Sequence, residues 1–524
     1  MRSMIITGLG LALTLAGCSG ADDSGSAAAV GSAAAGGSYA SGGFSAGGPI
    51  SGSGGSSGGY SGTGGGSSTA GSAGQAGQEL DAGASADAEA DASACEQLDS
   101  EKDTILFLSS DDSNSMGSPA IARSLLMAGQ KVPPSMVRTH EFLNYYNVGY
   151  PAADAGSLSI VTELRPAAAT GEFELQIGVA SPPAVKPRRS MVLTFVLDTS
   201  GSMAGAPIAR QADVARAIGK QLQSGDIVSI LTWNTAQAVV LDAHVASGPN
   251  DSKFVQAING LSASGGTDLS GGLSKGYGIA QKNFAPDKLN RVVLISDGVA
   301  NVGVTDETVI GQGAMLNDGD GIYLVGVGVG AGVNDTLMDT VTDAGRGAYV
   351  YIDSTGEADK MFGPRFDEVM DIAARAVQVE LRMPWYMAMK KFYGEKYSTN
   401  PKEVEPQHLA PNDAMVFTQI VKACDATLVD PLHPVEVFAR WQTPMTHQSK
   451  EVKLGTTLAS LLDSTPKYLP KGLAIIAFAE ALKEPATAKT RLAEAKQLVL
   501  AAGASGDAEL TEVQSLIEKA MTLY

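Results

Sequence analysis

Two aspartates and three hydroxyl residues lie in three short segments of the chain. Asp198, Ser200 and Ser202 form a D-x-S-x-S pattern, and Thr267 and Asp297 follow later. No Cys or His belongs to these segments, which argues against zinc or copper. Oxygen donors suit a hard cation, and Mg²⁺ takes few protein ligands while keeping several waters. Because hydroxyls are neutral, the cation stays electrophilic, and an open coordination position would attract a carboxylate from a partner protein.

The residues before two of these segments predict how the side chains meet. Residues 191–197 form a nearly continuous apolar run that ends at Asp198, and residues 291–296 form another that ends at Asp297. Such runs are typical of strands buried on both faces of a parallel sheet. In open α/β sheets, ligands bind outside the carboxyl ends of the strands. With Thr267 at the start of a helix, we expect the three loops to converge on one sheet edge.

The surrounding sequence alternates between strand and helix patterns. Further strands are expected over 226–233, 238–241, 322–327 and 347–352, and helices over 207–223, 252–258, 268–281, 306–316 and 334–342. Strands that alternate with helices imply crossover connections. The sequence therefore predicts an α/β fold with a doubly wound, mostly parallel sheet.

These residues, in this order, resemble the metal-ion-dependent adhesion site of the von Willebrand factor type A family. The resemblance covers about residues 191–371, within a domain expected over 188–371. It implies a divalent cation, Mg²⁺ first and Mn²⁺ or Ca²⁺ as alternatives, with the hydroxyls as direct ligands and the aspartates often acting through water. The implied ligand set is Asp198, Ser200, Ser202, Thr267 and Asp297.

Two alternatives to a working metal site stay open. Asp and Ser also cap helices and form turns, so the same residues could be purely structural. A chain with this fold could also retain only a weak or vestigial site.

The N-terminus has the pattern of an export signal. Arg2 precedes an apolar stretch over residues 5–16, which is too short to span a bilayer. The sequence Leu15-Ala16-Gly17-Cys18 resembles the lipobox of bacterial lipoproteins, which implies lipidation of Cys18 and, with Ser19 next, an outer-membrane location on either face. Residues 1–18 are thus expected to be a lipoprotein signal peptide; an ordinary signal peptide with an incidental cysteine is the alternative.

Residues 19–99 are expected to form a flexible tether. This segment is rich in Gly, Ser and Ala and cannot bury enough apolar surface to fold. A G-x-S-x-G pattern at 43–47 lacks the flanking strand and helix that a catalytic serine needs, so we interpret it as chance. The net charge of −19 disfavours binding to nucleic acid.

Two cysteines, Cys95 and Cys424, remain beyond the lipobox. In an exported protein they are consistent with a disulfide or with two separate thiols. A disulfide would join the end of the tether to the C-terminal region.

Accessory domains are expected on both sides of the type A domain. Residues 100–187 include a segment that resembles one preceding the type A domain in a family of bacterial lipoproteins. Residues 372–524 predict strands over 376–383, 414–421 and 435–441, then helices over 473–482, 486–501 and 508–523, with a weak resemblance to the same family's C-terminal module. The matching N-terminal residues are Pro133, Pro134, Arg138, Glu141, Phe142, Asn144 and Tyr145.

The sequence favours a binding protein over an enzyme. No nucleophile and base are evident together, and a hydroxyl-rich metal shell is unlike that of metal-dependent hydrolases. A G-x-G-x-x-A pattern at 326–331 comes too late in the sheet for a dinucleotide site.

We expect an adhesion or scaffolding lipoprotein whose partner presents a carboxylate. The alternatives are an envelope-assembly or stress-related scaffold and a metal-dependent hydrolase; the oligomeric state is left open.

Overall fold

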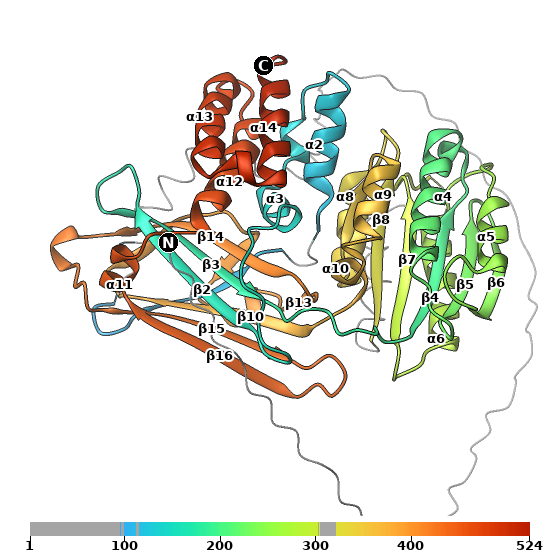
Figure 1. Ribbon diagram of the computed structural model, residues 1–524, viewed down its shortest axis with the longest axis horizontal. Coiled ribbons are helices and arrows are strands. Elements are labelled where there is room, and N and C mark those ends of the chain that lie inside the picture. The colour runs from blue at the N-terminus through green and yellow to red at the C-terminus, as the bar shows by residue number, and fades with distance from the viewer. Residues whose placement is uncertain (1–94, 96–98, 112–114, 302, 304–320) are drawn as a thin grey trace, which may run out of the picture. The chain divides into compact units, whose positions relative to one another are not determined.

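The computed structural model of the chain describes residues 95, 99–111, 115–301, 303 and 321–524 (Figure 1). The signal peptide with Cys18, most of the expected tether, the pattern at 43–47 and the helix expected over 306–316 lie outside the described residues. Within the described ranges, no helix combines the length and the apolar character needed to cross a bilayer.

The middle of the chain forms a sheet with the strand order β6-β5-β4-β7-β8-β9. All neighbours are parallel except the edge pair of β5 and β6. The strands are β4 (Met191–Asp198), β5 (Ile227–Trp233), β6 (Gln237–Val245), β7 (Leu289–Ser296), β8 (Ile322–Val329) and β9 (Tyr349–Ile352).

Helices bury both faces of this sheet. Every residue of β4, β7 and β8 is buried. On one face, Phe195 packs in a cluster with residues of α4 (Ala206–Gly219), α5 (Ser252–Asn259) and α9 (Thr355–Met361). On the other, Val196 packs with α6 (Leu269–Lys282) and α8 (Asp335–Ala344). The expectation of a doubly wound, mostly parallel α/β sheet is confirmed.

Two antiparallel sheets form a second layered structure. One has the order β12-β1-β10-β15-β16, with β13 also beside β10, and the other has the order β11-β14-β3-β2. A single hydrophobic cluster draws side chains from both sheets, so they pack face to face as a sandwich. The strands are β1 (Thr104–Ser109), β2 (Ser159–Pro166), β3 (Glu172–Ala180), β10 (Ala374–Met383), β11 (Met387–Phe392), β12 (Lys396–Ser398), β13 (Gln407–Leu409), β14 (Ala414–Ala423), β15 (Pro434–Gln442) and β16 (Ser449–Thr457).

The sandwich is built from both ends of the chain. β1 pairs with β10, and β3 pairs with β14, so the segments expected as separate accessory domains share both sheets. The type A region is therefore an insertion between β3 and β10. Such pairings join residues hundreds of positions apart, which no local pattern specifies. A disulfide joins Cys95, before β1, to Cys424, just after β14, with their Cα atoms 5.7 Å apart.

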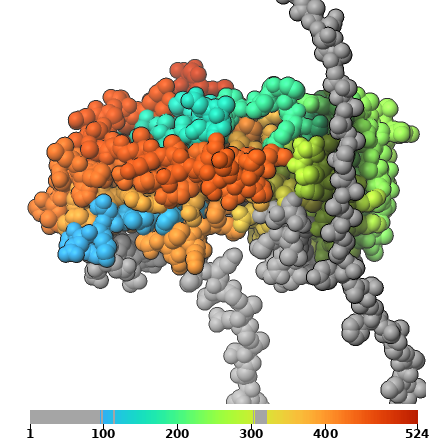
Figure 2. Space-filling model, turned by 90° about the horizontal axis from the view of Figure 1, so that it is seen from below, coloured from blue at the N-terminus to red at the C-terminus, as the bar shows by residue number. Residues whose placement is uncertain are grey.

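The C-terminal helices pack against the N-terminal ones. α12 (Leu469–Lys483), α13 (Ala488–Ala501) and α14 (Ala508–Met521) lie beside α2 (Gly117–Met127) and α3 (Thr139–Tyr145) in Figure 1. Phe142 of α3 meets Phe478 of α12 edge to face, with ring centroids 5.8 Å apart. On another face, β16 forms an edge of the sandwich with alternating exposed residues, within the orange-red band of Figure 2.

Candidate metal centre

The first candidate ligand closes the central strand. Asp198 is the last residue of β4 and is 0 % exposed. Its Oδ1 accepts a hydrogen bond from the Ser200 backbone N–H at 2.8 Å, and its Oδ2 accepts one from the Ser296 hydroxyl at 2.7 Å. Both oxygens are thus held in place from two different strand ends.

The two serines of the first loop lie together. The Oγ atoms of Ser200 and Ser202 are 3.1 Å apart. Ser200 is buried, whereas Ser202 is exposed in the short 3₁₀ turn η2 (Gly201–Met203). The pair therefore runs from the buried carboxylate of Asp198 toward the surface.

Backbone hydrogen bonds join the first loop to the second. The Gly201 N–H donates to the carbonyl of Gly265 at 3.0 Å, and the Ser264 N–H donates to that of Thr199 at 2.7 Å. A Cβ at Gly201 would lie only 3.1 Å from the Gly265 oxygen, and Gly265 has a φ of +83°. Both positions favour glycine, which lets the two loops approach this closely.

A third loop completes the edge. Thr267 is buried, and its N–H donates to the side-chain oxygen of Asn301 at 2.8 Å, while the Asn301 N–H returns a bond to its carbonyl at 3.1 Å. Asp297 follows β7 and is 5 % exposed; its Oδ1 accepts from the Val299 N–H at 3.2 Å. The structure thus brings the loops of all five expected residues to one edge of the sheet.

The two carboxylates of this edge lack a cationic partner among the residues that the structure describes. In the part of the chain that the structure describes, no Lys, Arg or His forms an ion pair with Asp198 or Asp297. Burial raises the pKa of Asp198 to about 6, against the opposing hydrogen bonds from Ser296 and Ser200, and the nearby charge of Asp297 adds to the rise. A bound cation would compensate this buried negative charge.

The donor set fits a hard cation better than a soft one. It has two carboxylates and three hydroxyls, and no group of three or more His, Cys, Asp or Glu forms a metal cluster in the described ranges. Zinc and copper sites generally need His nitrogen or Cys sulfur ligands, which this set lacks, whereas Mg²⁺ completes its coordination shell with water. The residues present therefore fit a magnesium-type site.

Two further residues of the edge were not expected from the sequence. Ser296 positions Asp198, and Asn301 positions Thr267. Ser296 directly precedes Asp297, so its place at a strand end was a usable signal. Asn301 had no such signal, because its contact depends on how the third loop folds back on the second.

A family comparison agrees with this geometry. Residues 193–299 match the sequence profile of the von Willebrand factor type A domain. The chain contains a type A domain. The matched residues include all five candidate ligands, the whole of β7 and most of β4.

Curated relatives match the chain at low identity. The chain is 28 % identical over 303 residues to the uncharacterized protein YfbK of Escherichia coli K12, covering 53 % of this chain and 51 % of that protein. It is 26 % identical over 206 residues to the protein sll0103 of Synechocystis, covering 39 % and 48 %. The inter-alpha-trypsin inhibitor heavy chain H2 of Mesocricetus auratus is 24 % identical over 245 residues, covering 44 % and 25 %. The chain spans about half the length of the first two relatives.

Solved structures resemble the chain at lower identity still. A von Willebrand factor type A protein from Catenulispora acidiphila has 15 % identity and a TM-score of 0.47, covering 67 % of this chain and 87 % of that one. The ArnB paralog VWA2 from Sulfolobus acidocaldarius has 12 % identity and a TM-score of 0.41, covering 70 % and 97 %.

Proposed function

We propose that the chain is a protein-binding lipoprotein whose type A domain uses a divalent cation, most readily Mg²⁺, to capture a carboxylate of a partner protein. The observation that carries this proposal is the pair of buried aspartates, Asp198 and Asp297, with no cationic partner in the described residues. Type A domains typically mediate protein–protein interactions. An adhesion or scaffolding role therefore fits both the fold and the charge at its edge.

Each side chain of the edge has a definable part in such binding. Ser200, Ser202 and Thr267 would hold the cation with neutral oxygens, while Asp198 and Asp297 supply the negative charge that retains it. When bound, the cation supplies an electrophilic position for an incoming carboxylate. Ser202 is the exposed member of the set, so the outer side of the site faces solvent, where a partner can reach it. The buried hydrogen bonds of Asp198 orient its carboxylate without help from the partner.

We infer binding rather than catalysis from the same donor set. Its only two carboxylates are the residues expected to retain the cation, so neither is left to act as a general base. A hydroxyl-rich shell also differs from the His-rich shells that activate water in hydrolases. An envelope-assembly or stress-related scaffold with a weak metal site is the competing function within the same fold.

We also propose export, lipidation at Cys18 and an outer-membrane location. The lipobox-like sequence before Cys18 supports this, although these residues lie outside the described ranges. The disulfide between Cys95 and Cys424 supports export independently, because disulfides persist in oxidising compartments.

Labelling with palmitate should mark the wild type and not Cys18→Ser, and the variant should leave the membrane fraction. Equal labelling of both would refute lipidation at this residue.

The metal site is tested by thermal unfolding of the protein in chelator and then in millimolar Mg²⁺, Mn²⁺ or Ca²⁺. A cation that binds only the folded state adds about 2.7 kcal/mol at a hundredfold excess over its Kd. The rise should disappear in Asp198→Ala and persist in Asp242→Ala, which removes an exposed carboxylate of β6. A wild type indifferent to all three cations would favour the weak-site scaffold.

Partner capture needs its own test. Crosslinking in cells that carry the wild type or Asp297→Ala should give products that depend on the intact site. Products that are identical in both strains would contradict cation-mediated capture while leaving the type A fold untouched.

A further inference from the structure

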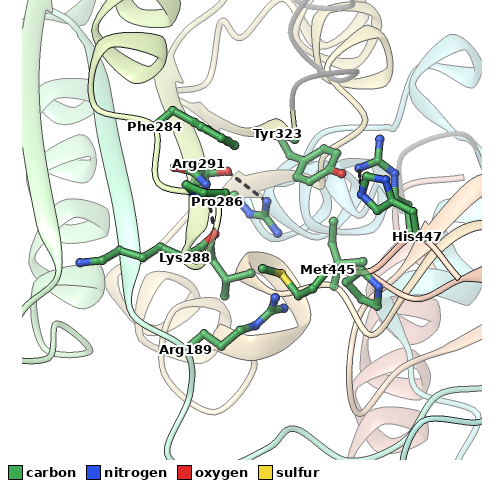
Figure 3. Close-up of a pocket in the computed structure, with 14 residues that line it drawn as sticks. Arg189, Phe284, Pro286, Lys288, Arg291, Tyr323, Met445 and His447 are labelled. Atoms are coloured by element: carbon green, nitrogen blue, oxygen red, sulfur yellow. Dashed lines mark hydrogen bonds between the residues drawn. The ribbon is translucent and has the colours of Figure 1, made fainter. Parts of the chain in front are cut away.

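A cavity of about 190 Å³ lies at the end of the type A sheet opposite the candidate metal centre. It opens beside the first residues of β7 and β8, whereas the metal centre lies beyond the last residue of β7. The length of β7 separates the two sites by roughly 25 Å. The wall is formed by the start of the domain, the loop before β7, the first residues of β7 and β8, the start of β10 with the residues before it, and the hairpin between β15 and β16 (Figure 3).

The most buried cation of this cavity, Arg291, forms no ion pair among the described residues, although the charge of Asp371 raises its pKa against the effect of burial. Arg291 is 3 % exposed, and its guanidinium donates to the backbone carbonyls of Met370 at 2.9 Å and Asn290 at 3.2 Å. Arginine is rarely this buried without a paired charge, because its desolvation is costly. Burial lowers the pKa of Arg291 to about 10, which still leaves it fully charged near neutral pH.

Two more guanidinium groups line the same cavity. Arg375 and Arg291 both lie beside the ring of Tyr323, at 5.5 and 5.0 Å from its centroid. Arg189 binds Asp371 at 2.8 Å through Nη2, while its Nη1 is buried and makes no hydrogen bond to the described residues. No Asp or Glu occurs among the described residues of the wall. In a chain of net charge −19, this local excess of positive charge indicates a site for an anion.

One cation of the wall does not contribute. The Lys288 ammonium group donates to the carbonyl of Gly225 at 2.8 Å and points away from the cavity in Figure 3. The positive charge of the cavity therefore comes mainly from the three arginines.

Apolar side chains complete the wall. Leu289 and Ile372 are buried there, and Phe284 and Met445 stand at the surface, 40 % and 45 % exposed. An anion that carries an apolar group would cover this surface, whereas a fully hydrated inorganic anion would not. An apolar cavity of about 150 Å³ holds benzene, so the space here suits a ligand of that size with one anionic group.

We propose that this cavity binds a small organic carboxylate, with its charged group against Arg291, Arg375 and Arg189 and its apolar part against Leu289, Ile372 and Met445. Planar guanidinium groups match the geometry of a carboxylate, and this match gives the site its specificity. The proposal does not depend on the metal centre, which lies at the other end of the sheet.

Calorimetric titration of the full chain with benzoate tests this assignment. Benzoate should bind saturably, while benzamide, its neutral isostere, should bind at least tenfold more weakly. Arg375→Gln should weaken benzoate binding at least tenfold, and Arg216→Gln, on the exposed face of α4, should not. Met445→Asp, at an exposed hairpin position, should also abolish binding by charge repulsion and keeps the proposal testable if Arg375→Gln fails to fold.

Three results would overturn the assignment: no benzoate binding by the wild type, equal binding of benzamide, or displacement of benzoate by an equal concentration of inorganic phosphate. The Mg²⁺-dependent rise in unfolding temperature should be unchanged in Arg375→Gln and Met445→Asp. That readout separates failure of the cavity assignment from failure of the metal site.

Discussion

The Ser296 hydroxyl shows how much of the metal centre depends on residues that would not touch the cation. It donates to Asp198 Oδ2 at 2.7 Å from the neighbouring strand β7, while Asp198 itself ends β4. A carboxylate held on both oxygens loses little freedom when a cation arrives. Hydrogen-bonding partners of metal ligands generally orient them and tune their affinity.

Removal of this hydroxyl should weaken the metal site without unfolding the domain. In Ser296→Ala we expect the affinity for Mg²⁺ to fall by about tenfold or more, as for other such partners of metal ligands. Calorimetric titration with Mg²⁺ measures this, with Ser274→Ala on the exposed face of α6 as the control. The positioning role is wrong if the two variants bind Mg²⁺ equally well.

Two glycines of the type A domain should respond to substitution by alanine in opposite directions. Gly298 has a φ of +71°, and a Cβ there would lie 2.8 Å from the Asn334 carbonyl oxygen, so Gly298→Ala should cost about 1–3 kcal/mol. Gly278 lies in α6 with open space around it, so Gly278→Ala should add up to about 1 kcal/mol. Urea denaturation of both variants checks the signs, and a stabilised Gly298→Ala would contradict the steric argument.

The sequence predicted where the candidate ligands lie but not what surrounds them. The D-x-S-x-S pattern and the strand ends pointed to Asp198 and Asp297 as residues of one sheet edge, because strand termini are visible in apolar periodicity. The contact between Asn301 and Thr267 joins residues 34 positions apart in loops, and loops carry no periodic signal.

The helix α12 is connected to two neighbouring elements by the carboxylate of Glu480. Glu480 accepts a hydrogen bond from Thr139 of α3 at 2.5 Å and pairs with Lys391 of β11 at 2.8 Å and with Lys483 of its own helix at 3.2 Å. Burial by itself would raise the pKa of Glu480, but the two ammonium groups and Thr139 bring it down to about 2. Besides the ring contact between Phe478 and Phe142 of α3, α12 thus has a polar contact to α3 and an ion pair to β11 of the sandwich.

This carboxylate predicts a particular acid dependence. Because its folded pKa lies below the ordinary value of 4.5, its stabilisation is complete above pH 4.5 and is lost as the pH falls toward about 2. The difference corresponds to about 3 kcal/mol at pH 7, which Glu480→Gln should lose. Glu484→Gln, just after the end of this helix and in an exposed ion pair with Arg491 of α13, should change little. Unfolding free energies measured from pH 7 to 2.5 should converge for the wild type and Glu480→Gln; parallel curves would contradict the assignment.

The elements themselves were predicted unevenly. The predicted bounds of the central strands agree closely with the observed ones, because a continuous apolar run of this length between helix patterns is typical of a buried strand. The edge strand β6 was expected over 238–241 but spans Gln237–Val245, because exposed edge strands lack an apolar signal. The accessory strands were partly recognised, yet the pairing of β1 with β10 depends on contacts that only the folded chain defines.

The disulfide between Cys95 and Cys424 closes a covalent loop of the chain, because the two cysteines are 329 positions apart. The type A domain lies within this loop. Such a bond stabilises a fold mainly by restricting the unfolded chain. The variant with both Cys95→Ser and Cys424→Ser should lose about 2–4 kcal/mol of unfolding free energy. Guanidinium denaturation with and without reductant measures this. Reductant should lower the stability of the wild type and leave the variant unchanged; a wild type insensitive to reductant would contradict a stabilising role.

The insertion of the type A domain between β3 and β10 also has a mechanical consequence. Both connections leave the type A domain near the cavity end of its sheet, close to Arg189 and Asp371, which pair at 2.8 Å, while a captured partner would pull at the opposite end, at Asp198. Tension between the two ends therefore runs along β4, which is hydrogen-bonded to β5 on one side and β7 on the other. A force along β4 loads its hydrogen bonds to β5 and β7 in shear. These bonds then resist the force together instead of breaking one after another. A domain attached in this way is suited to holding its partner under force.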